Sequence, residues 1–270
     1  MLVLIKGAGD LATGTAVRLF RSGFSVVMTD LERPTAVRRT VAFSQAIYDG
    51  ETTVEGITAR RCAGAAEVRE ALAAGVVPVL ADPAAEIRRA MDFDAEVDAI
   101  LAKRNLGTRI NDAPIVLALG PGFTAGVDCH AVIETMRGHD LGRVITRGSA
   151  IPNTGVPGDV GGYTVERVIR AGAEGPFEPL AAIGERVERG QEVARVAGTV
   201  TRAQLTGIVR GMLPAGQWVR AGMKAGDIDP RCQESHCFTV SDKARAIGGG
   251  VLEGLLRFAH ERERQGSTTT

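Results

Sequence analysis

The first thirty residues alternate between apolar runs and helical spacing. Residues 2–5 (LVLI) are wholly apolar, which is typical of a parallel strand buried on both faces. Apolar positions then recur at helical spacing over residues 11–20, and Gly23 ends the predicted helix. Residues 24–30 (FSVVMTD) predict a second strand. The pattern is that of a strand–helix–strand unit with a glycine-containing turn after its first strand.

The same alternation continues through the first half of the chain. A further helical element is predicted from Pro34, because proline suits a first helical turn. More helices are predicted at 65–74 and 83–91, and more strands at 76–81, 97–101, 115–119, 129–134 and 143–146. Strands that alternate with helices indicate an α/β fold with a mostly parallel sheet covered on both faces. The predicted class is Rossmann-like.

The pattern changes beyond a loop at residues 147–164, where five of eighteen positions are glycine and two are proline. Residues 175–196 align without a gap on residues 207–228, at an offset of 32. The glycine spacing is shared by both copies, and short β segments separated by glycine turns predict a small two-fold β-sandwich. This pattern is typical of the biotinyl/lipoyl-type barrel-sandwich module.

The predicted domain order follows from these segments. A helix capped by Ser241 or Asp242 is expected to pack back on the first domain, which makes the β module an insertion. The predicted divisions are a Rossmann-like domain at 1–165, a barrel-sandwich module at 166–230, a returning helical segment at 231–262 and a disordered tail at 263–270.

Charge and composition exclude several classes of protein. Thirty-two basic residues balance thirty-two acidic ones, so no global field favours nucleic acid or an anionic membrane. No apolar run approaches the length of a membrane span, and no signal peptide precedes the first glycines. Four cysteines are too few and too scattered for a disulfide framework. These features predict a cytoplasmic protein with no nucleic-acid or membrane partner.

The first glycine turn has the spacing of a phosphate-binding motif. Gly7 permits a tight turn, Gly9 lets the backbone approach a phosphate, and Ala12 keeps helix and strand close. Asp30 ends the second strand, where an acid that binds a ribose belongs. Asp10 does not suit this motif, because its carboxylate falls near the phosphate position. A metal, a polar pterin-like group or an altered pose would accommodate it, and a role as a helix N-cap is the alternative.

A second glycine turn, Gly120–Pro121–Gly122–Phe123, follows the predicted strand 115–119. Because loops at the carboxyl ends of parallel strands converge, both turns are expected to face one ligand. Gly120, Gly122 and Phe123 therefore join the predicted cofactor-binding residues. His130 is a lone histidine in a strand, where a hydrogen-bonded structural role is favoured over acid–base chemistry.

The cysteines and lysines narrow the chemistry further. Cys232, His236 and Cys237 offer three ligands at poor zinc spacing, so no metal site is predicted. A chalcogen-relay role for Cys129 or Cys237 stands against the usual state of a buried, unreactive thiol, and the role of Cys232 is equally open. Residues 197–206 contain no lysine, which excludes a lipoyl or biotinyl carrier.

Several segments resemble one family, the YqeB-type proteins. They are VLIKGAGDLATG, RRTVAFSQAIYDGETTVEG, LGPGFTAGVDCHAVIET, the lysine-less β module and SDKARAIGGGVLE. The resemblance implies an accessory protein of the selenium-dependent molybdenum hydroxylase system, with a Rossmann part related to XdhC-type chaperones. It implies binding of a molybdenum cofactor of molybdopterin type. It also implies a molybdenum hydroxylase apoprotein as partner, with a sulfur- or selenium-donating enzyme as a further candidate. It supplies no catalytic residues.

Three functional hypotheses follow. The favoured one is a non-catalytic maturation protein that binds a molybdopterin- or nucleotide-type ligand in the crevice. The second is an NAD(P)-dependent oxidoreductase with a dinucleotide cofactor. Asp10 and the lack of an evident acid–base pair count against it. The third is a scaffold with a vestigial site.

Overall fold

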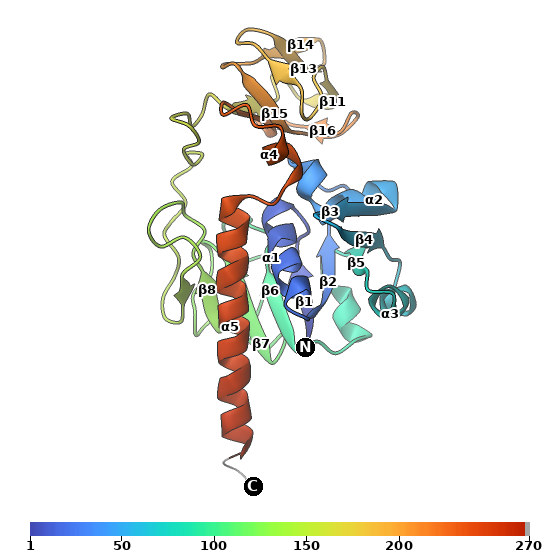
Figure 1. Cartoon of the computed structure of the whole chain (residues 1–270), viewed down its shortest axis with the longest axis vertical. Coiled ribbons are helices and arrows are strands. Elements are labelled where there is room, and N and C mark those ends of the chain that lie inside the picture. Colours follow the sequence, from blue (N-terminus) through green and yellow to red (C-terminus); the bar gives the residue numbers. More distant parts are fainter. Residues whose placement is uncertain (268–270) are drawn as a thin grey trace. The chain divides into compact units, whose positions relative to one another are not determined.

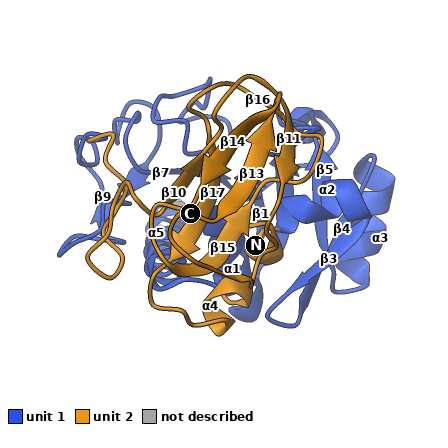
Figure 2. Ribbon diagram, turned by 90° about the horizontal axis from the view of Figure 1, so that it is seen from above, with its two compact units in different colours: residues 1–34, 43–153, 240–270 blue, residues 35–42, 154–239 orange. Residues whose placement is uncertain are grey.

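A computed structural model describes residues 1–267, with side chains through residue 265. The chain divides into two compact units (Figures 1 and 2). Unit 1 comprises residues 1–34, 43–153 and 240–270, and unit 2 comprises residues 35–42 and 154–239. Three separate parts of the chain therefore build unit 1, and unit 2 includes a short piece from the amino-terminal part.

Unit 1 is built on one large sheet. Its strands are β1 (Leu2–Lys6), β2 (Ser25–Asp30), β3 (Glu51–Val54), β4 (Ile57–Arg61), β5 (Val77–Ala81), β6 (Ala95–Asp98), β7 (Ile115–Leu119), β8 (Ala131–Ile133) and β9 (Val144–Ile145). Its α-helices are α1 (Asp10–Arg21), α2 (Ala46–Asp49), α3 (Ala65–Ala73) and α5 (Asp242–Ser267). The strand order is β3-β4-β5-β2-β1-β6-β7-β8-β9.

The sheet is mixed. In this order, all neighbouring strands from β4 through β2 and β1 to β8 pair in parallel. The outer pairs β3–β4 and β8–β9 are antiparallel. The loops that follow β1, β2, β6, β7 and β8 therefore leave the sheet on one side. We call this side the carboxyl edge.

The two faces of the sheet are covered differently. Helices α1 and α5 pack side by side, and α5 also lies against β7, where a Cβ added at Gly254 would be 3.1 Å from Leu117 (Figure 1). On the other face, α3 packs over Leu4 and Val27. Next to it, loop residues including Phe123 cover β7 and β8 without a helix.

The predicted fold class, a Rossmann-like mostly parallel sheet with an inserted barrel-sandwich module, is wrong. A doubly wound sheet needs a helix in each crossover, on both faces. Here the connections from β6 to β7 and from β7 to β8 contain no helix in the described chain. The layer over these strands comes instead from α5, and the sheet ends in antiparallel pairs on both sides. Local periodicity cannot distinguish these arrangements, because single strands look alike in both.

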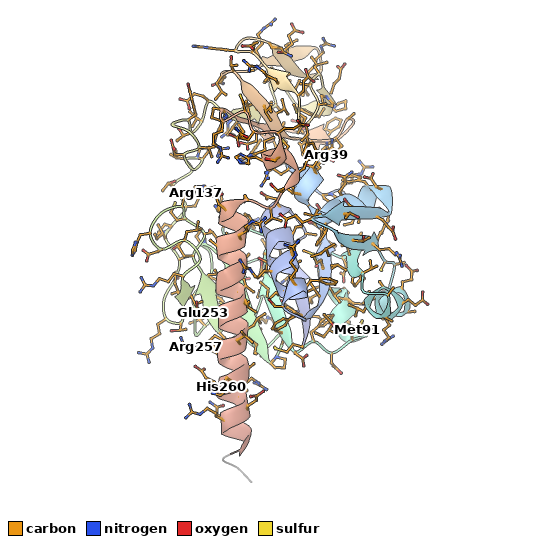
Figure 3. All side chains as sticks on the ribbon, viewed as in Figure 1. Arg39, Met91, Arg137, Glu253, Arg257 and His260 are labelled. Atoms are coloured by element: carbon orange, nitrogen blue, oxygen red, sulfur yellow. The ribbon has the colours of Figure 1, made fainter. Side chains whose placement is uncertain are left out.

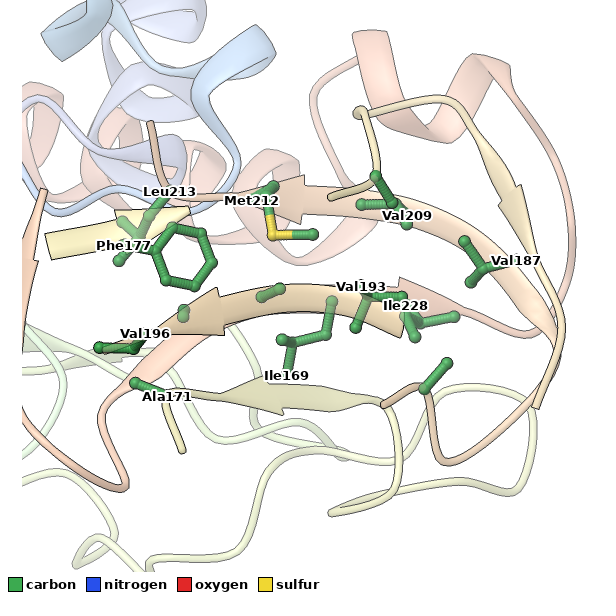
Figure 4. Close-up of a cluster of buried hydrophobic side chains, with 14 of the residues drawn as sticks. Ile169, Ala171, Phe177, Val187, Val193, Val196, Val209, Met212, Leu213 and Ile228 are labelled. Carbon is green, nitrogen blue, oxygen red and sulfur yellow. The ribbon is translucent and has the colours of Figure 1, made fainter. Parts of the chain in front are cut away.

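Unit 2 contains two four-stranded antiparallel sheets. Its strands are β10 (Val168–Arg170), β11 (Gly175–Pro179), β12 (Arg186–Val187), β13 (Glu192–Val196), β14 (Thr199–Arg202), β15 (Gly207–Met212), β16 (Trp218–Val219) and β17 (Lys224–Asp229). The orders are β10-β17-β15-β12 and β14-β13-β11-β16. Phe177, Met212 and Leu213 are among the buried side chains of its core (Figure 4).

The 32-residue repeat has a direct structural counterpart. Strands β11, β12 and β13 of the first copy correspond to β15, β16 and β17 of the second. The short strands are exchanged, since β12 pairs with β15 and β16 pairs with β11. Each copy therefore completes the sheet of the other.

Unit 2 is not a self-contained insertion, because residues 35–42 complete it. The carbonyl oxygen of Val37 accepts the N–H of Met212 at 2.7 Å, and Arg39 donates to the carbonyl of Met212 at 2.8 Å. Arg38 is buried and donates to the carbonyls of His236 and Thr239. The helix predicted from Pro34 is limited to a 3-10 turn, η1 (Arg39–Val41). The carbonyl of Val37 and the side chains of Arg38 and Arg39 bond instead to distant residues.

Other boundaries differ from the prediction as well. The helix predicted at 83–91 is a 3-10 turn, η3 (Glu86–Arg89). Helix α5 includes residues 263–267 of the predicted disordered tail, and residues 268–270 lie outside the described part. A four-residue helix, α4 (Ser235–Phe238), belongs to unit 2. None of the helices in the described chain combines the length and apolarity needed to cross a bilayer.

The glycines of α5 let two helices approach closely. A Cβ added at Gly14 of α1 would lie 2.5 Å from Ala244, and one at Gly248 would lie 3.0 Å from the carbonyl oxygen of Gly14. A Cβ at Gly250 would overlap the carbonyl oxygen of Gly142, whereas one at Gly249 would meet no atom within 4 Å. The motif SDKARAIGGGVLE therefore has a packing role along α5.

These neighbouring glycines provide a matched pair of substitutions. Gly249→Ala should stabilise the protein by about 0.5–1 kcal/mol, since alanine favours a helix and this position is open. Gly250→Ala should destabilise it by about 1–3 kcal/mol, because its methyl group has no room. Urea unfolding followed by circular dichroism tests both. Equal effects of the two variants would contradict the packing described.

Candidate functional site

The carboxyl edge contains the two glycine turns at which the sequence predicts a bound ligand. The two predicted glycine turns follow β1 and β7, which are separated only by β6. Gly7 has φ +96°, and a Cβ there would lie 2.7 Å from the carbonyl oxygen of Ala99. Gly122 has φ +110°, and a Cβ there would lie 2.5 Å from the Cα of Arg104. Both turns therefore pack against the loop after β6, residues 99–108.

Asp30 braces the first turn. Its carboxylate accepts the N–H of Ala8 at 2.8 Å and that of Leu31 at 2.7 Å. The carbonyl of Ala8 in turn accepts the N–H of Ser44 at 2.9 Å. Burial raises the pKa of Asp30, and the two N–H donors oppose that rise. The geometry thus gives Asp30 a local structural role in the turn itself.

The start of α1 differs from the predicted motif in detail. Gly9 is the N-cap with φ −69° and ψ −177°, which is extended backbone open to any residue, and it makes no side-chain cap. Asp10 is the first helical residue and not the cap. Ala12 is buried, as close packing between helix and strand requires.

The second turn is held from inside the fold. A Cβ at Gly120 would lie 2.5 Å from the hydroxyl of Thr135, in the loop after β8. Phe123 is buried in the cluster that covers β7 and β8, so its side chain belongs to the core. The backbone of this turn, and not the side chain of Phe123, is therefore the part that is available to a ligand at the carboxyl edge.

The loop at 99–108 carries backbone strain. Leu101 and Lys103 have φ of 61° and 62°, in the left-handed region that side chains other than glycine rarely adopt. Strain of this kind costs about 1–3 kcal/mol per residue and gathers at functional sites. Lys103 and Arg104 are exposed, and neither makes a side-chain hydrogen bond or ion pair with a described residue.

Lys243 is a partly buried cation at the same edge. It lies in the first turn of α5, which is capped by Ser241 through the N–H of Ala244 at 3.2 Å. Its ammonium makes no hydrogen bond or ion pair within the described chain. Burial lowers the pKa of Lys243, the charges of Arg137 and Lys103 lower it further, and Asp10 and Glu134 oppose the fall.

The neighbours of Lys243 are already engaged. Arg137 donates twice to Asp242, at 2.6 and 2.8 Å, close to the start of α5 (Figure 3). Glu134 is buried and accepts the N–H groups of Thr135, Met136 and Ile151. Lys243 is thus a positive charge whose acidic neighbours, Asp10 and Glu134, offset the fall in its pKa only in part.

Helix direction adds to this positive charge. The contacts of Gly14 with Ala244, and of Gly248 with Gly14 and Arg18, place equivalent turns of α1 and α5 side by side in parallel. Both helices therefore begin at the carboxyl edge. Two helix N-termini present partial positive charge and N–H groups to the same space.

A buried charged cluster connects the edge to the interior. Lys6 ends β1, is 5% exposed, and donates to Thr108 at 2.5 Å. Its ammonium lies 3.6 Å from Glu96 and 3.7 Å from Asp98. Thr108 donates to Asp98 at 2.6 Å. This cluster fixes the loop at 99–108 on the sheet, at the place where a Rossmann fold would carry a helix.

The sequence contained a signal for some of these residues. Lys6 ends an apolar strand, and Glu96 and Asp98 alternate with apolar residues in the next strand of the sheet. Charges at buried strand positions are rare unless they are paired or functional. Lys243 carried no such signal, because its burial depends on the return of α5, which begins about 120 residues beyond the second turn.

The cysteines are mostly shielded. Burial raises the pKa of Cys129 to about 12 and also raises the pKa of Cys62 and Cys237. All three are buried, whereas Cys232 is partly exposed. Within residues 1–265 no three His, Cys, Asp or Glu side chains are grouped so as to hold a metal ion.

Thiol labelling tests this difference. With iodoacetamide at pH 8 the native protein should be alkylated at Cys232 alone, because reaction needs an accessible thiolate. Denaturation should expose all four thiols. Peptide mass spectrometry locates the adducts. Rapid alkylation of native Cys129 or Cys237 would show a reactive thiol of the kind a chalcogen relay requires.

Comparisons with solved structures found remote likenesses. An aspartoacylase family protein from Mesorhizobium loti matches with 13% identity, 84% of each chain covered and a TM-score of 0.28. A succinylglutamate desuccinylase/aspartoacylase from Rhodobacter sphaeroides matches with 17% identity, 84% of each chain covered and a TM-score of 0.27. TM-scores this low do not assign a shared fold.

Sequence comparison gives a much closer relative. No protein-family model matches the chain. A protein of Escherichia coli (strain K12) is 53% identical over 260 residues, which is 96% of this chain and 48% of that protein. The chain thus spans about half the length of the curated relative it matches. Over nearly all of its own length, the chain is a homologue of that protein, which is named "Uncharacterized protein YqeB".

Proposed function

We propose that this chain is an accessory protein for the maturation of a molybdenum hydroxylase, and that it holds a phosphate-bearing cofactor at the carboxyl edge. The favoured cofactor is of molybdopterin type. The observation that carries the proposal is Lys243, a partly buried ammonium without a partner in the described chain, set among the starts of two parallel helices. The setting in molybdenum hydroxylase maturation comes from the motif resemblance.

The residues present fit a phosphate group. A partly buried charge is costly where its acidic neighbours do not offset its burial, and an anionic ligand would offset it further. Lys103 belongs to the same neighbourhood, because its charge acts on Lys243. Lys243 and Lys103 would hold the phosphate, and the N–H groups at the helix starts would orient it. Asp10 compensates the charge of Lys243 only in part, because the pKa of that lysine is still below its ordinary value.

The same geometry weakens the case for a dinucleotide. Each carboxylate oxygen of Asp30 already accepts one backbone N–H within the turn. A ribose would have to share these oxygens. A molybdopterin-type cofactor needs no such contact, and its molybdenum chemistry would serve the hydroxylase. The role of this chain would be to bind, shield and release the cofactor.

Anion binding gives the direct test. Lys243→Met should weaken binding of inorganic pyrophosphate by about ten-fold or more, because a charge-assisted hydrogen bond contributes about 1.5–3 kcal/mol. Lys103→Met should have a smaller effect, since Lys103 is exposed. Lys224→Met, an exposed lysine of unit 2, is the matched control. Isothermal titration calorimetry measures all four proteins, and unchanged affinity in Lys243→Met would overturn the proposed site.

The identity of the cofactor needs a separate measurement. Protein purified from a cell that makes molybdenum cofactor should release a pterin that fluoresces after oxidation, and Lys243→Met should release much less. Release of a nicotinamide dinucleotide instead would favour an oxidoreductase. Release of neither, together with pyrophosphate binding that depends on Lys243, would leave the anion site in place and refute the pterin.

A further inference from the structure

A cavity of about 660 Å³ lies in unit 1 at the amino ends of β6, β7 and β8, opposite the carboxyl edge. We call it the amino-edge pocket. Its lining includes Arg88, Met91, Phe93, Ile110, His130 and Arg262. Its volume falls within the range of about 300–1,000 Å³ that is usual for small-molecule sites. Nothing in the proposed function uses it.

The charged groups of the pocket differ in how far they are engaged. Arg88 is bound on both sides, to Glu96 at 3.0 Å and to Asp112 at 2.9 Å. Arg262 of α5 makes one hydrogen bond, to the carbonyl oxygen of Pro114 at 3.3 Å. The other N–H groups of Arg262 have no partner among the described residues. Arg262, an exposed residue that also lines the pocket, is therefore the pocket cation whose remaining donors are open to solvent or to a ligand.

His130 stands beside this cation. Its Nδ1 accepts the N–H of Val116 at 3.0 Å, so the neutral ring carries its proton on Nε2 and can donate there. Its ring packs against Phe258 of α5, with 5.6 Å between centroids. Burial lowers the pKa of His130, and the charge of Arg262 lowers it further. Glu96, Asp92 and Asp112 are the acidic residues of the lining, and Arg88 pairs with Glu96 and Asp112.

The rest of the lining supplies an apolar surface. Phe93 is buried, and Met91 and Ile110 are partly exposed on the cavity wall. A guanidinium with free donors and an imidazole N–H suit a single planar anion, because a carboxylate accepts two parallel hydrogen bonds. The apolar side chains suit an attached hydrocarbon or ring.

We propose that the amino-edge pocket binds a small carboxylate with an apolar body, held by Arg262 and His130. The carboxylate faces these two donors, and its apolar part contacts Met91, Phe93 and Ile110. The pocket lies at the opposite side of the sheet from the carboxyl edge, so this site is independent of the proposed cofactor site.

Nuclear magnetic resonance of the histidine ring tests the proposal on the full chain, with phenylacetate and hexanoate as probes. Either probe should raise the pKa of His130, because a nearby carboxylate stabilises the imidazolium form. The neutral analogue 2-phenylethanol should bind about ten-fold or more weakly and leave that pKa unchanged. His130→Gln assigns the resonance among the four histidines.

Two arginine variants distinguish an effect on the pocket from a general effect on α5. Arg262→Gln should weaken phenylacetate binding about ten-fold, since it removes the charged donor. Arg257→Gln is the matched control, because Arg257 lies over Phe258, pairs with Glu261 and is outside the pocket lining. Absence of a His130 response to both probes would overturn the proposal. Equal affinity for phenylacetate and 2-phenylethanol, or equal effects of the two arginine variants, would overturn it too.

Discussion

Lys6→Met is expected to lower the free energy of unfolding by about 3–5 kcal/mol at pH 7. The substitution keeps the length of the side chain and removes the ammonium that lies 3.6 Å from Glu96 and 3.7 Å from Asp98. Both carboxylates are buried, at 0% and 1% exposure, and would be left without that counter-ion. Because unit 1 contains α1, α3 and α5, urea unfolding followed by far-ultraviolet circular dichroism reports on it.

The pH dependence distinguishes lost charge from lost packing. Burial already raises the pKa of Glu96, and removing the ammonium raises it further. The deficit of Lys6→Met should therefore shrink as the pH falls and Glu96 becomes protonated. Addition of Glu96→Gln and Asp98→Asn should recover part of the loss at pH 7. Lys103→Met, at an exposed lysine, should change stability by less than about 0.5 kcal/mol. A deficit that is constant with pH would contradict the electrostatic account.

Asp227→Asn is expected to destabilise unit 2 by a similar amount, about 3–5 kcal/mol. Asp227 is 1% exposed and accepts from Arg167 with one oxygen and from Arg210 with the other, at 2.9 and 2.5 Å. An asparagine would set an NH₂ group against one of these guanidinium groups. Hydrogen exchange read by mass spectrometry should show faster exchange in peptides from β15 and β17. Peptides from β1 and β6 serve as the internal reference.

Acid should weaken the same network in the wild-type chain. Asp229 accepts from Arg210 and Arg231, which overcomes its burial and lowers its pKa to about 2. A depressed pKa stabilises the fold above the unfolded value of 3.8, and the contribution of about 2 kcal/mol is lost as the pH falls toward 2.

Glu174→Gln, an exposed acid of unit 2, is the control for Asp227→Asn. Unchanged exchange in Asp227→Asn would show that the network does not stabilise unit 2.

Local patterns predicted many elements of this fold. The apolar runs at 2–5 and 115–119 are strands, the helical spacing after Gly9 is α1, and the 32-residue repeat appears as matched strands. Each of these depends on a period of two or 3.6, or on repeated glycine turns, which short segments carry by themselves. The position of both glycine turns at one edge follows from the parallel strands that precede them.

Long-range partners account for what could not be predicted. Residues 35–42 read as a helix because their partners, Met212 and the carbonyls of α4, are nearly 200 residues away. The sequence of the connection after β6 resembles that of any other crossover, although the hydrogen bond from Lys6 to Thr108 holds this connection as a loop. Lys243 becomes a candidate ligand contact only when α5 packs beside α1. Spacing along the chain does not reveal such contacts.

The exchanged strands of unit 2 bear on how that unit can fold. Since β12 completes the sheet of β15 and β16 completes the sheet of β11, neither copy, 175–196 or 207–228, can bury its apolar face alone. The two copies must therefore gain their structure in one cooperative step, and a fragment that ends between them would expose half of a core. The same exchange of strands would join two separate, identical segments into a dimer. Joining them in one chain turns an association between molecules into a closure within one molecule, which makes their pairing independent of concentration.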